Sequence, residues 1–338
     1  MTQHSGRYDV VIVGGGPAGL SGALMLGRAR RSVLVIDSGQ PRNAPAAHMH
    51  GFLSRDGVPP GHLLDTGRQE AASYGGTFVT GRARSASRED DGFAVELDTG
   101  RTVRARRLLV TTGITDELPD IPGLGARWGR DVLHCPYCHG WEVRDQPIGV
   151  LATSPMSVHQ ALLFRQWTDR LTLLLHTGPR PTREEREQLA ARDIAVVAGE
   201  VCRLEITDDR LAGVRLRTGE MIPLRALAVA PRAVPRAEVL ATLGLESTPH
   251  PRGLGEYIAA DATGLTRIPG VWVAGNLADP AANVLAAAAS GATAAGAINA
   301  GLITDDTRRA VQARHDPFYP ESEARLCEHV MGDRRHGL

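Results

Sequence analysis

Lysine is absent from this 338-residue sequence, so all 38 of its Lys and Arg residues are arginine. This absence excludes a lysine Schiff base and the lysine of a Walker-type phosphate-binding loop. An excess of charge of one sign is absent too, because 38 acidic residues balance the 38 basic ones. A chain without a positive excess has no electrostatic basis for binding nucleic acid or an anionic membrane. The composition therefore predicts no nucleic acid and no membrane among the partners.

A signal peptide and a long apolar run are also missing. Residues 1–8 are polar and lack the basic, apolar and small-residue order of a signal peptide. No uncharged apolar run is long enough to cross a bilayer, and the Ala-rich residues 285–300 are interrupted by Gly, Ser, Thr and Asn. We expect that stretch to form a buried helix and the protein to be cytoplasmic. In the cytoplasm, four cysteines favour redox or metal chemistry over structural disulfides.

Residues 8–37 predict a dinucleotide-binding βαβ unit. An apolar strand leads into Gly14, Gly16 and Gly19, a helix follows to about residue 29, and a second strand ends at Asp37. In such a unit the first glycine permits a tight turn, the second lets the backbone approach a pyrophosphate, and the third lets the helix pack closely on the strand. The helix N-terminus faces the phosphates, and the acidic residue binds the ribose hydroxyls. The predicted cofactor-binding residues of this unit are Gly14, Gly16, Pro17, Ala18, Gly19, Asp37 and Ser38.

The next residues predict one helix and several short strands before a linker. The helix covers residues 58–74, and the strands cover residues 77–81, 93–97, 102–104 and 108–111. The last strand leads into Gly113, which is a further candidate for cofactor binding. Residues 116–130 are rich in Pro and Gly, as is typical of a linker between domains.

A second βαβ pattern begins at Ile148. It contains a strand over residues 148–151, a helix over residues 156–167 and a strand over residues 171–176. The turn at residues 152–157 has no glycine, so its Cβ atoms obstruct a pyrophosphate, and its proline removes a donor. The second strand is followed by no cluster of arginines of the kind that NADP binding requires. The pattern therefore predicts a dinucleotide-binding fold that does not bind NAD(P)H.

The chain then returns to the first domain. Residues 270–274 predict a strand that ends in Gly275 and Asn276, with Asp279 shortly after and the Ala-rich helix beyond. This small-residue turn suits a second contact with the cofactor of the first domain. We therefore expect an α/β fold with two Rossmann-like domains, in which the cofactor-binding domain is discontinuous. The expected boundaries are 1–116 and 241–304 for that domain and 117–240 for the inserted one.

Residues 305–338 predict a C-terminal tail. They are charged and contain His315, Cys327, His329 and His336. The sequence allows either a solvated tail or a tail laid over the active site.

Residues 134–139 carry the chemistry that the sequence specifies best. Cys135 and Cys138 are separated by two residues, which places the sulfur atoms within disulfide range inside one helical turn. The alternative is half of a zinc site. No second Cys pair or metal-spaced His pair completes it, since Cys202 and Cys327 are isolated. The spacing therefore predicts a redox-active pair and no metal.

Four histidines are candidates for a role beside this pair. His139 follows Cys138 directly and titrates near neutral pH, so it is the predicted proton acceptor for an attacking thiol. His48 and His50 are substrate-side candidates, and loop packing or solvation explains them equally well. His134 is a substrate-side candidate too, although an imidazole there can simply tune the redox potential.

These motifs together resemble the low-molecular-weight thioredoxin reductase family along nearly the whole chain. The matching pieces are the Gly14 turn, the segment up to Gly113, the Cys pair in the inserted domain, and Gly275 to Asp279. The resemblance implies that the discontinuous domain binds FAD, that the inserted domain has the NADPH-binding fold, and that the protein is a homodimer. It also implies that Cys138 contacts the flavin and that Cys135 faces the substrate.

Three departures indicate a particular branch of that family. The NADPH glycines are missing, the arginines after the next strand are missing, and His139 replaces the usual acid after the second cysteine. All three resemble the bacterial and fungal dithiol oxidases that close disulfides in holomycin and gliotoxin. The resemblance implies a small dithiol as substrate, oxygen as acceptor and hydrogen peroxide as product. Asn276, where the family usually has Asp, leaves one cofactor contact open.

Two other functions remain compatible with the sequence. The first is a thioredoxin reductase, fed by NADPH or by reduced ferredoxin, whose partner is a thioredoxin-like protein. The second is a flavoprotein redox sensor with negligible turnover.

Overall fold

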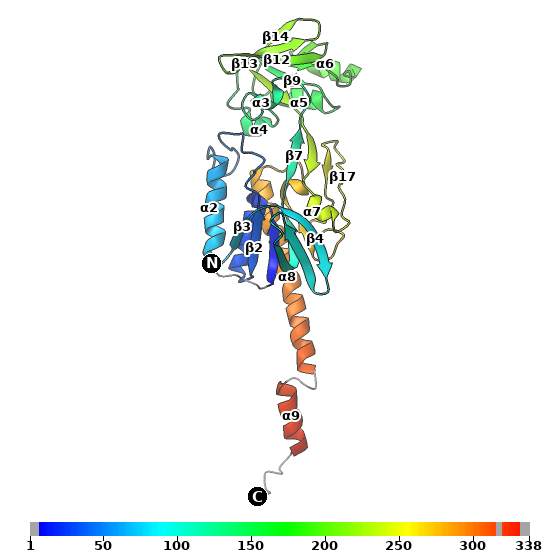
Figure 1. The fold of residues 1–338 in the computed structure, drawn as a ribbon. Helices are drawn as coiled ribbons and strands as arrows, with labels where there is room; N and C mark the ends of the chain where they lie inside the picture. Colours follow the sequence, from blue (N-terminus) through cyan, green and yellow to red (C-terminus); the bar gives the residue numbers. More distant parts are fainter. Residues whose placement is uncertain (1–6, 316–319, 332–338) are drawn as a thin grey trace.

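The computed structural model describes residues 7–315 and 320–331, and it contains two lobes that are each built on a sheet with parallel strands (Figure 1). The larger lobe has a seven-stranded sheet in the order β3-β2-β1-β6-β5-β4, with β19 paired to β6. Its strands are β1 (Tyr8–Val13), β2 (Val33–Asp37), β3 (Thr77–Thr80), β4 (Ala83–Glu89), β5 (Gly92–Leu97), β6 (Thr102–Val110) and β19 (Val271–Val273). The helices and short strands around it are α1 (Pro17–Arg28), α2 (Pro60–Ser73), α7 (Glu238–Ala241), η1 (Gly275–Leu277), α8 (Val284–His315), β17 (Thr248–Pro249) and β18 (Glu256–Tyr257).

The central strands of this sheet are apolar on both faces because both faces are covered. Val10 and Ile12 of β1 pack with α1 and α8, whereas Val11 and Val13 face a second core with β4, β5 and α7. Strands buried on both faces read as continuous apolar runs, as the sequence of β1 and β2 does. The parallel order of β1, β2, β6 and β19 brings their carboxyl ends together at one edge of the sheet.

The smaller lobe lies at the other end of the molecule from α9 (Pro320–Met331) (Figure 1). Its parallel sheet has the order β11-β10-β9-β15-β8, and an antiparallel sheet, β12-β13-β14, packs nearby on the same core. The elements are α3 (Leu124–Arg127), β8 (Val132–Leu133), α4 (Pro136–His139), β9 (Ile148–Leu151), α5 (Ser157–Phe164), β10 (Leu171–Leu174), α6 (Arg183–Ala191), β11 (Ala195–Val197), β12 (Val201–Thr207), β13 (Arg210–Leu216), β14 (Met221–Pro223) and β15 (Ala226–Val229).

Two antiparallel strands carry the chain between the lobes. β7 (Ile114–Glu117) leaves the larger lobe, and β16 (Arg232–Pro235) returns and pairs with it. The predicted boundary after residue 240 is therefore too late. Val239 and Leu240 of α7 already belong to the core of the seven-stranded sheet.

The predicted elements differ from the structure at several places. The strands expected at residues 102–104 and 108–111 are one strand, β6, which pairs with β5 along its first half and with β19 along its second half. β4, whose side chains are mostly polar and exposed, was not predicted. Two more elements were not predicted either: β7, which overlaps the start of the expected linker, and α3, which lies inside it. A polar edge strand carries too little apolar pattern to be recognised from sequence.

The Ala-rich helix is longer and less buried than expected. α8 has 32 residues, of which six are buried against the lobe, and its last turns extend away from it (Figure 1). By length and composition alone this helix could cross a membrane, but its apolar stretch packs on α1 and the sheet. Of the two arrangements that the sequence allows for the tail, its described residues fit a solvated tail, because none of them lines the cavity that holds the Cys pair. His315 ends α8, Cys327 and His329 lie on α9, and His336 lies outside the described residues.

Candidate active site

A cavity of about 690 Å³ opens at the carboxyl ends of the parallel strands of the larger lobe. Its walls come from both lobes, because the glycine turn, the β6 end, the η1 segment and the Cys pair all line it. Switch points at the strand ends of open α/β sheets are the usual places for ligands. Of the predicted cofactor-binding residues, the cavity is lined by Gly14, Gly16, Pro17, Ala18, Asp37, Ser38, Gly113, Gly275 and Asn276.

The glycine turn has the geometry that the sequence predicts. Gly14 has a φ of 108°, and a Cβ there would lie 2.5 Å from the Thr111 carbonyl oxygen. A Cβ on Gly19 would lie 1.9 Å from the Gly14 carbonyl oxygen, which explains why helix and strand can meet so closely. By contrast, a Cβ on Gly16 would meet nothing within 4 Å, so the space above this residue is free. That free space, at the N-terminus of α1, fits the pyrophosphate of FAD.

Asp37 ends β2 beside this turn, and its carboxylate Oδ1 accepts a hydrogen bond from the backbone N–H of Gly15 at 3.1 Å. Its Oδ2 lies 3.2 Å from an Nη2 donor of Arg68 on α2. These contacts hold the carboxylate at the cavity wall. In that position it can bind the ribose hydroxyls of the cofactor, as the sequence predicts.

Asn276 and Asp279 differ in what they contribute. The Asn276 side-chain amide donates to the carbonyl oxygens of Asp279, Pro280 and Ala282 at 3.2, 3.3 and 2.8 Å, so it ties the turn before α8 together. A carboxylate cannot donate to these carbonyl groups, and this explains the asparagine. Asp279 is exposed and does not line the cavity. Its Oδ1 instead accepts from the Ala281 N–H, so we correct its role to turn formation.

The Cys pair lies on a single helical turn. Cys135 is the N-cap of α4, and the N–H groups of Cys138 and His139 both donate to the Cys135 carbonyl oxygen at 3.2 Å. Pro136 occupies the first helical position, where the fixed φ favours the turn. Both sulfur-bearing residues are half-buried free thiols that line the cavity.

The two thiols differ sharply in acidity. A hydrogen bond from the Cys138 thiol, together with backbone N–H groups of Tyr137 and Cys138, lowers the pKa of Cys135 to about 7. The same hydrogen bond, reinforced by burial and by the negative charge on Cys135, raises the pKa of Cys138. In the reduced pair Cys135 is therefore the first thiol to ionise, and Cys138 keeps its proton until a base removes it.

His139 also lines the cavity, and burial lowers its pKa. Its imidazole is therefore neutral at neutral pH and can accept a proton. The negative charge of Glu142 raises the pKa of His139, and the charge of His50 lowers it. His50 itself bridges two carboxylates, with Nδ1 3.2 Å from Asp56 and Nε2 3.4 Å from Glu142.

The other two histidine candidates also line the cavity. His48 is exposed at the rim. His134 precedes Cys135, and burial lowers its pKa, with the charge of Arg42 acting in the same direction. The structure therefore brings all four predicted histidines to the same cavity as the Cys pair.

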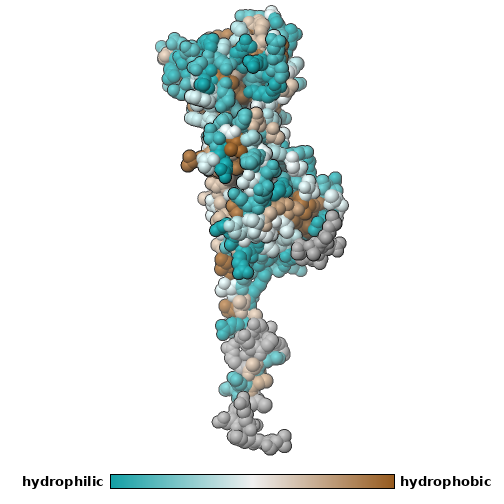
Figure 2. Space-filling view, turned by 90° about the vertical axis from the view of Figure 1, so that its left-hand side faces the viewer, coloured by the Kyte–Doolittle hydropathy of each residue, from teal (hydrophilic) through white to brown (hydrophobic). Residues whose placement is uncertain are grey.

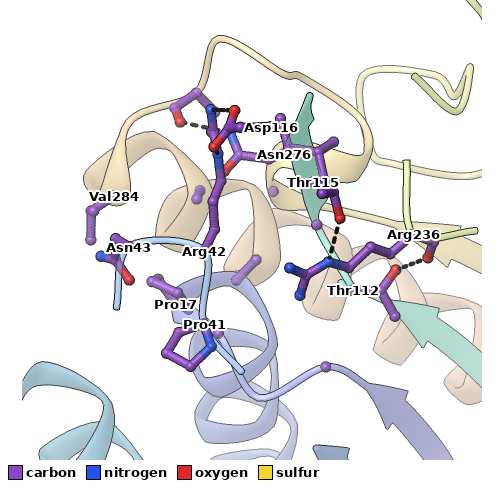
Figure 3. A pocket seen from close by; sticks show the side chains of 18 of the residues that line it. Pro17, Pro41, Arg42, Asn43, Thr112, Thr115, Asp116, Arg236, Asn276 and Val284 are labelled. Atoms are coloured by element: carbon purple, nitrogen blue, oxygen red, sulfur yellow. Dashed lines mark hydrogen bonds and ion pairs between the residues drawn. The ribbon is translucent and has the colours of Figure 1, made fainter. Parts of the chain in front are cut away.

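Sequence reasoning missed Arg42 and Asp116, which form a bidentate ion pair inside this cavity (Figure 3). Arg42 follows β2, and its Nε and Nη2 donate to the Asp116 carboxylate of β7 at 2.8 and 2.6 Å. Beside it, Arg236 donates to Thr115, and Thr112 donates to the Arg236 carbonyl oxygen (Figure 3). No spacing or motif marks these residues, because the contacts join segments far apart in the sequence.

The turn of the smaller lobe is hydrogen-bonded within itself, and it lines a second, smaller cavity of about 170 Å³. The N–H groups of Thr153 and Ser154 donate to Oγ of Ser157 at 3.2 and 3.3 Å, and Ser157 is buried. Gly178 packs on the turn so closely that a Cβ there would lie 2.7 Å from the Ala152 backbone. The donors that would face a pyrophosphate are therefore already satisfied within the protein.

Comparisons with known proteins agree on one family. Residues 8–299 match the pyridine nucleotide-disulphide oxidoreductase family. The chain is 30% identical over 284 residues to thioredoxin reductase aclD of Aspergillus oryzae, covering 80% of this chain and 88% of that protein. It is 29% identical over 309 residues to thioredoxin reductase sirT of Leptosphaeria maculans, covering 86% of this chain and 93% of that protein.

Two solved structures have a similar fold. The structure of HlmI is 48% identical with a TM-score of 0.86, and the match covers 93% of this chain and 98% of that one. An oxidoreductase from Agrobacterium tumefaciens is 37% identical with a TM-score of 0.83, and the match covers 88% of this chain and 99% of that one.

Proposed function

The chain belongs to the pyridine nucleotide-disulphide oxidoreductase family and is a thioredoxin reductase-like enzyme, and we propose that it is an FAD-dependent dithiol oxidase. Membership of this family implies FAD binding, and the free space above Gly16 suits that cofactor. FAD, when bound, accepts two electrons from the dithiol pair and passes them to oxygen, which leaves as hydrogen peroxide.

One observation carries the choice of an oxidase over a reductase. In the turn that would bind the NADPH pyrophosphate, the N–H groups of Thr153 and Ser154 already donate to Ser157. Binding a pyrophosphate there would require breaking these contacts and moving the backbone. Without a nicotinamide donor, the electrons are proposed to enter from a small dithiol at the Cys pair.

We assign the chemistry at the pair to three residues. A substrate thiolate attacks Cys135 in the oxidised pair, a bond forms between the two sulfurs, and Cys138 leaves as a thiolate. The second substrate thiol then loses its proton to His139 and attacks the substrate sulfur of the mixed disulfide, so the bond to Cys135 breaks and Cys135 leaves as a thiolate. The substrate departs as a disulfide, and both electrons remain on the Cys pair.

His139 has a second task in the reduced pair. Cys138 leaves as a thiolate, but its raised pKa favours reprotonation, so His139, once it has released its first proton to solvent, is needed to return the sulfur to the thiolate that the resemblance places against the flavin. The neighbouring imidazole, kept neutral by burial, is suited to take that proton.

A second candidate partner is a thioredoxin-like protein. Tyr137 and Trp141, next to the Cys pair in the chain, expose 71% and 64% of their surface, and Leu53, on the loop that carries His50, exposes 87%. Figure 2 shows apolar side chains on the surface where the two lobes meet. Exposed apolar groups beside a reactive site favour contact with a partner, whether a small apolar dithiol or a protein.

We further propose a homodimer in the cytoplasm. Ile303, Val311 and Leu326 are exposed on the arm formed by α8 and α9, which stands away from the lobe. An isolated helical arm is only marginally stable in water. The exposed apolar residues on this arm therefore favour a dimer in which a second copy of the chain covers them. Size-exclusion chromatography with light scattering measures the oligomeric state.

Anaerobic mixing of the FAD-loaded enzyme tests the proposed function. A small dithiol should bleach the flavin absorbance, readmitted oxygen should restore it with release of hydrogen peroxide, and NADPH should leave it unchanged. Fast and complete bleaching by micromolar NADPH would overturn the proposal in favour of a reductase. Bleaching by reduced ferredoxin alone would favour the ferredoxin-linked alternative, and no oxygen uptake with any dithiol would favour a sensor.

A further inference from the structure

The Arg42 guanidinium is held in a fixed position in the cavity of the Cys pair. Both of its bonds to Asp116 are short, and the two side chains keep only 27% and 9% of their surface exposed. A bidentate pair of this kind fixes both the position and the plane of the guanidinium. Thr112 donates to the Arg236 carbonyl oxygen, and the Arg236 side chain donates to Thr115. These bonds tie β7, which carries Asp116, to the segment after β16, so Asp116 is held in place.

This cation comes from a different lobe than the thiols. Arg42 follows β2 of the larger lobe, whereas Cys135 and Cys138 lie on α4 of the smaller one. All three residues line the same cavity. The positive charge of Arg42 lowers the pKa of Cys135 and opposes the rise at Cys138.

Other charged and titratable groups line the same cavity or contact its wall, so Arg42 is one of several charges near the pair. They come from the loop after β2, from β7, from β8, from α4 and from the segment after α4, and are His48, His50, Asp116, His134, His139 and Glu142. Arg42 is the cation that is held by a buried carboxylate rather than by solvent-exposed contacts. Its charge at the cavity is therefore present at every pH at which the enzyme works.

We propose that Arg42 is an electrostatic positioning residue for the redox pair, anchored by Asp116, and that it favours the thiolate forms of Cys135 and Cys138. Each thiol that ionises transfers its proton to a base or to water, and the guanidinium stabilises the sulfur anion that remains. Arg42 belongs to the larger lobe and the thiols belong to the smaller one. The thiolates are therefore stabilised when the two lobes are placed so that α4 lies against the loop after β2. The inference rests on the proposed redox role of the pair.

Alkylation of Cys135 measures this effect without any turnover. In a Cys138→Ser background, the rate of reaction of the reduced protein with iodoacetamide, followed by mass spectrometry, rises with pH as the thiolate forms. Arg42→Gln should move that rise to higher pH, and the rate one pH unit below the parent midpoint should fall about threefold to tenfold. Arg232→Gln is the matched control. Arg232 pairs with Glu117, next to Asp116 on the same two-stranded ribbon, but does not line the cavity.

The absence of lysine allows the charge to be removed after folding. Arg42→Lys creates a side-chain amine that is unique in the chain. Its alkylation profile should resemble that of the parent. Treating the oxidised Arg42→Lys protein, with both cysteines present, with an N-hydroxysuccinimide acetate neutralises that amine. After subsequent reduction, the Cys135 profile should lie at higher pH than that of the untreated Arg42→Lys protein with both cysteines, while the parent treated in the same way does not change.

The outcomes separate this inference from its competitors. An unchanged profile after acetylation of the Arg42→Lys protein overturns the proposal, even if Arg42→Gln fails to fold. A loss of bound FAD in Arg42→Gln with an unshifted thiol profile would assign Arg42 to the cofactor instead. Failure of the enzyme to oxidise any dithiol, with the predicted shifts intact, would leave Arg42 in its role and overturn only the proposed function.

Discussion

Nε2 of His50 lies 3.4 Å from the Glu142 carboxylate, and these two residues come from different lobes. His50 belongs to the loop that follows β2, whereas Glu142 lies three residues after His139. The contact therefore joins that loop to the segment that carries the predicted base. Because Glu142 also raises the pKa of His139, the same carboxylate links the contact between the lobes to the basicity of the active site.

Glu142→Gln should shift the pH dependence of dithiol oxidation to lower pH. A nearby negative charge favours the protonated imidazole, so its removal lowers the pKa of His139 further. His139 then stays neutral at lower pH, and the acid limb of kcat/KM moves in that direction. A weaker base also accepts a proton less readily, so the plateau should fall severalfold. Glu187→Gln on exposed α6 is the control. A shift to higher pH would contradict this electrostatic account.

His139→Ala should reduce dithiol oxidation about a hundredfold to ten-thousandfold at neutral pH, since a positioned general base contributes that much. FAD binding should survive, because the glycine turn and Asp37 lie on other elements. The loss should shrink as pH rises toward a thiol pKa of about 8.5, where thiols ionise without help. A pH-rate profile under saturating dithiol and oxygen measures this. A small loss that is the same at every pH would remove His139 from the mechanism.

The sequence predicts the parts of this site that depend on local pattern. The glycine turn, the strand that ends at Asp37 and the Cys pair each follow from spacing within one segment, and the structure brings these residues to one cavity. The contacts of Arg42 with Asp116 and of His50 with Glu142 join segments that are 74 and 92 residues apart, and no local pattern encodes them. Asp279 shows that local pattern can also mislead. Its place after the Gly275 turn suggested a cofactor contact, but its side chain accepts a hydrogen bond within the turn.

Cys135→Ser should show a long-wavelength charge-transfer band with oxidised FAD, and Cys138→Ser should not. In the first variant the negative charge and the sulfur partner that raise the pKa of Cys138 are removed, so its thiolate forms nearer to the usual thiol range. The resemblance places this sulfur against the flavin. Absorbance spectra of the two variants between about pH 6 and about pH 10 provide the test. A band in Cys138→Ser instead would reverse the assignment of the two sulfurs.

Gly291→Ala and Gly296→Ala, both on α8, should have opposite effects on stability. A Cβ on Gly291 would lie 1.9 Å from the Ala18 carbonyl oxygen of α1, so the two helices must move apart. Overpacking of this kind typically costs about 1–3 kcal/mol. Ala18 also lines the cavity, so FAD should bind more weakly. A Cβ on exposed Gly296 meets nothing within 4 Å, and replacing a mid-helix glycine by alanine gains about 0.5–1 kcal/mol.

Thermal unfolding monitored by the fluorescence of released FAD distinguishes the two variants. We expect the Tm of Gly291→Ala to fall and its flavin to leave before the protein unfolds, because the contact of α1 with α8 supports the glycine turn. The Tm of Gly296→Ala should rise slightly with flavin retention unchanged, since only helix propensity is altered. If both variants melted like the parent, the close contact between Gly291 and Ala18 would not determine the stability of the larger lobe. The small residues of α8 would then not be what positions the cofactor turn.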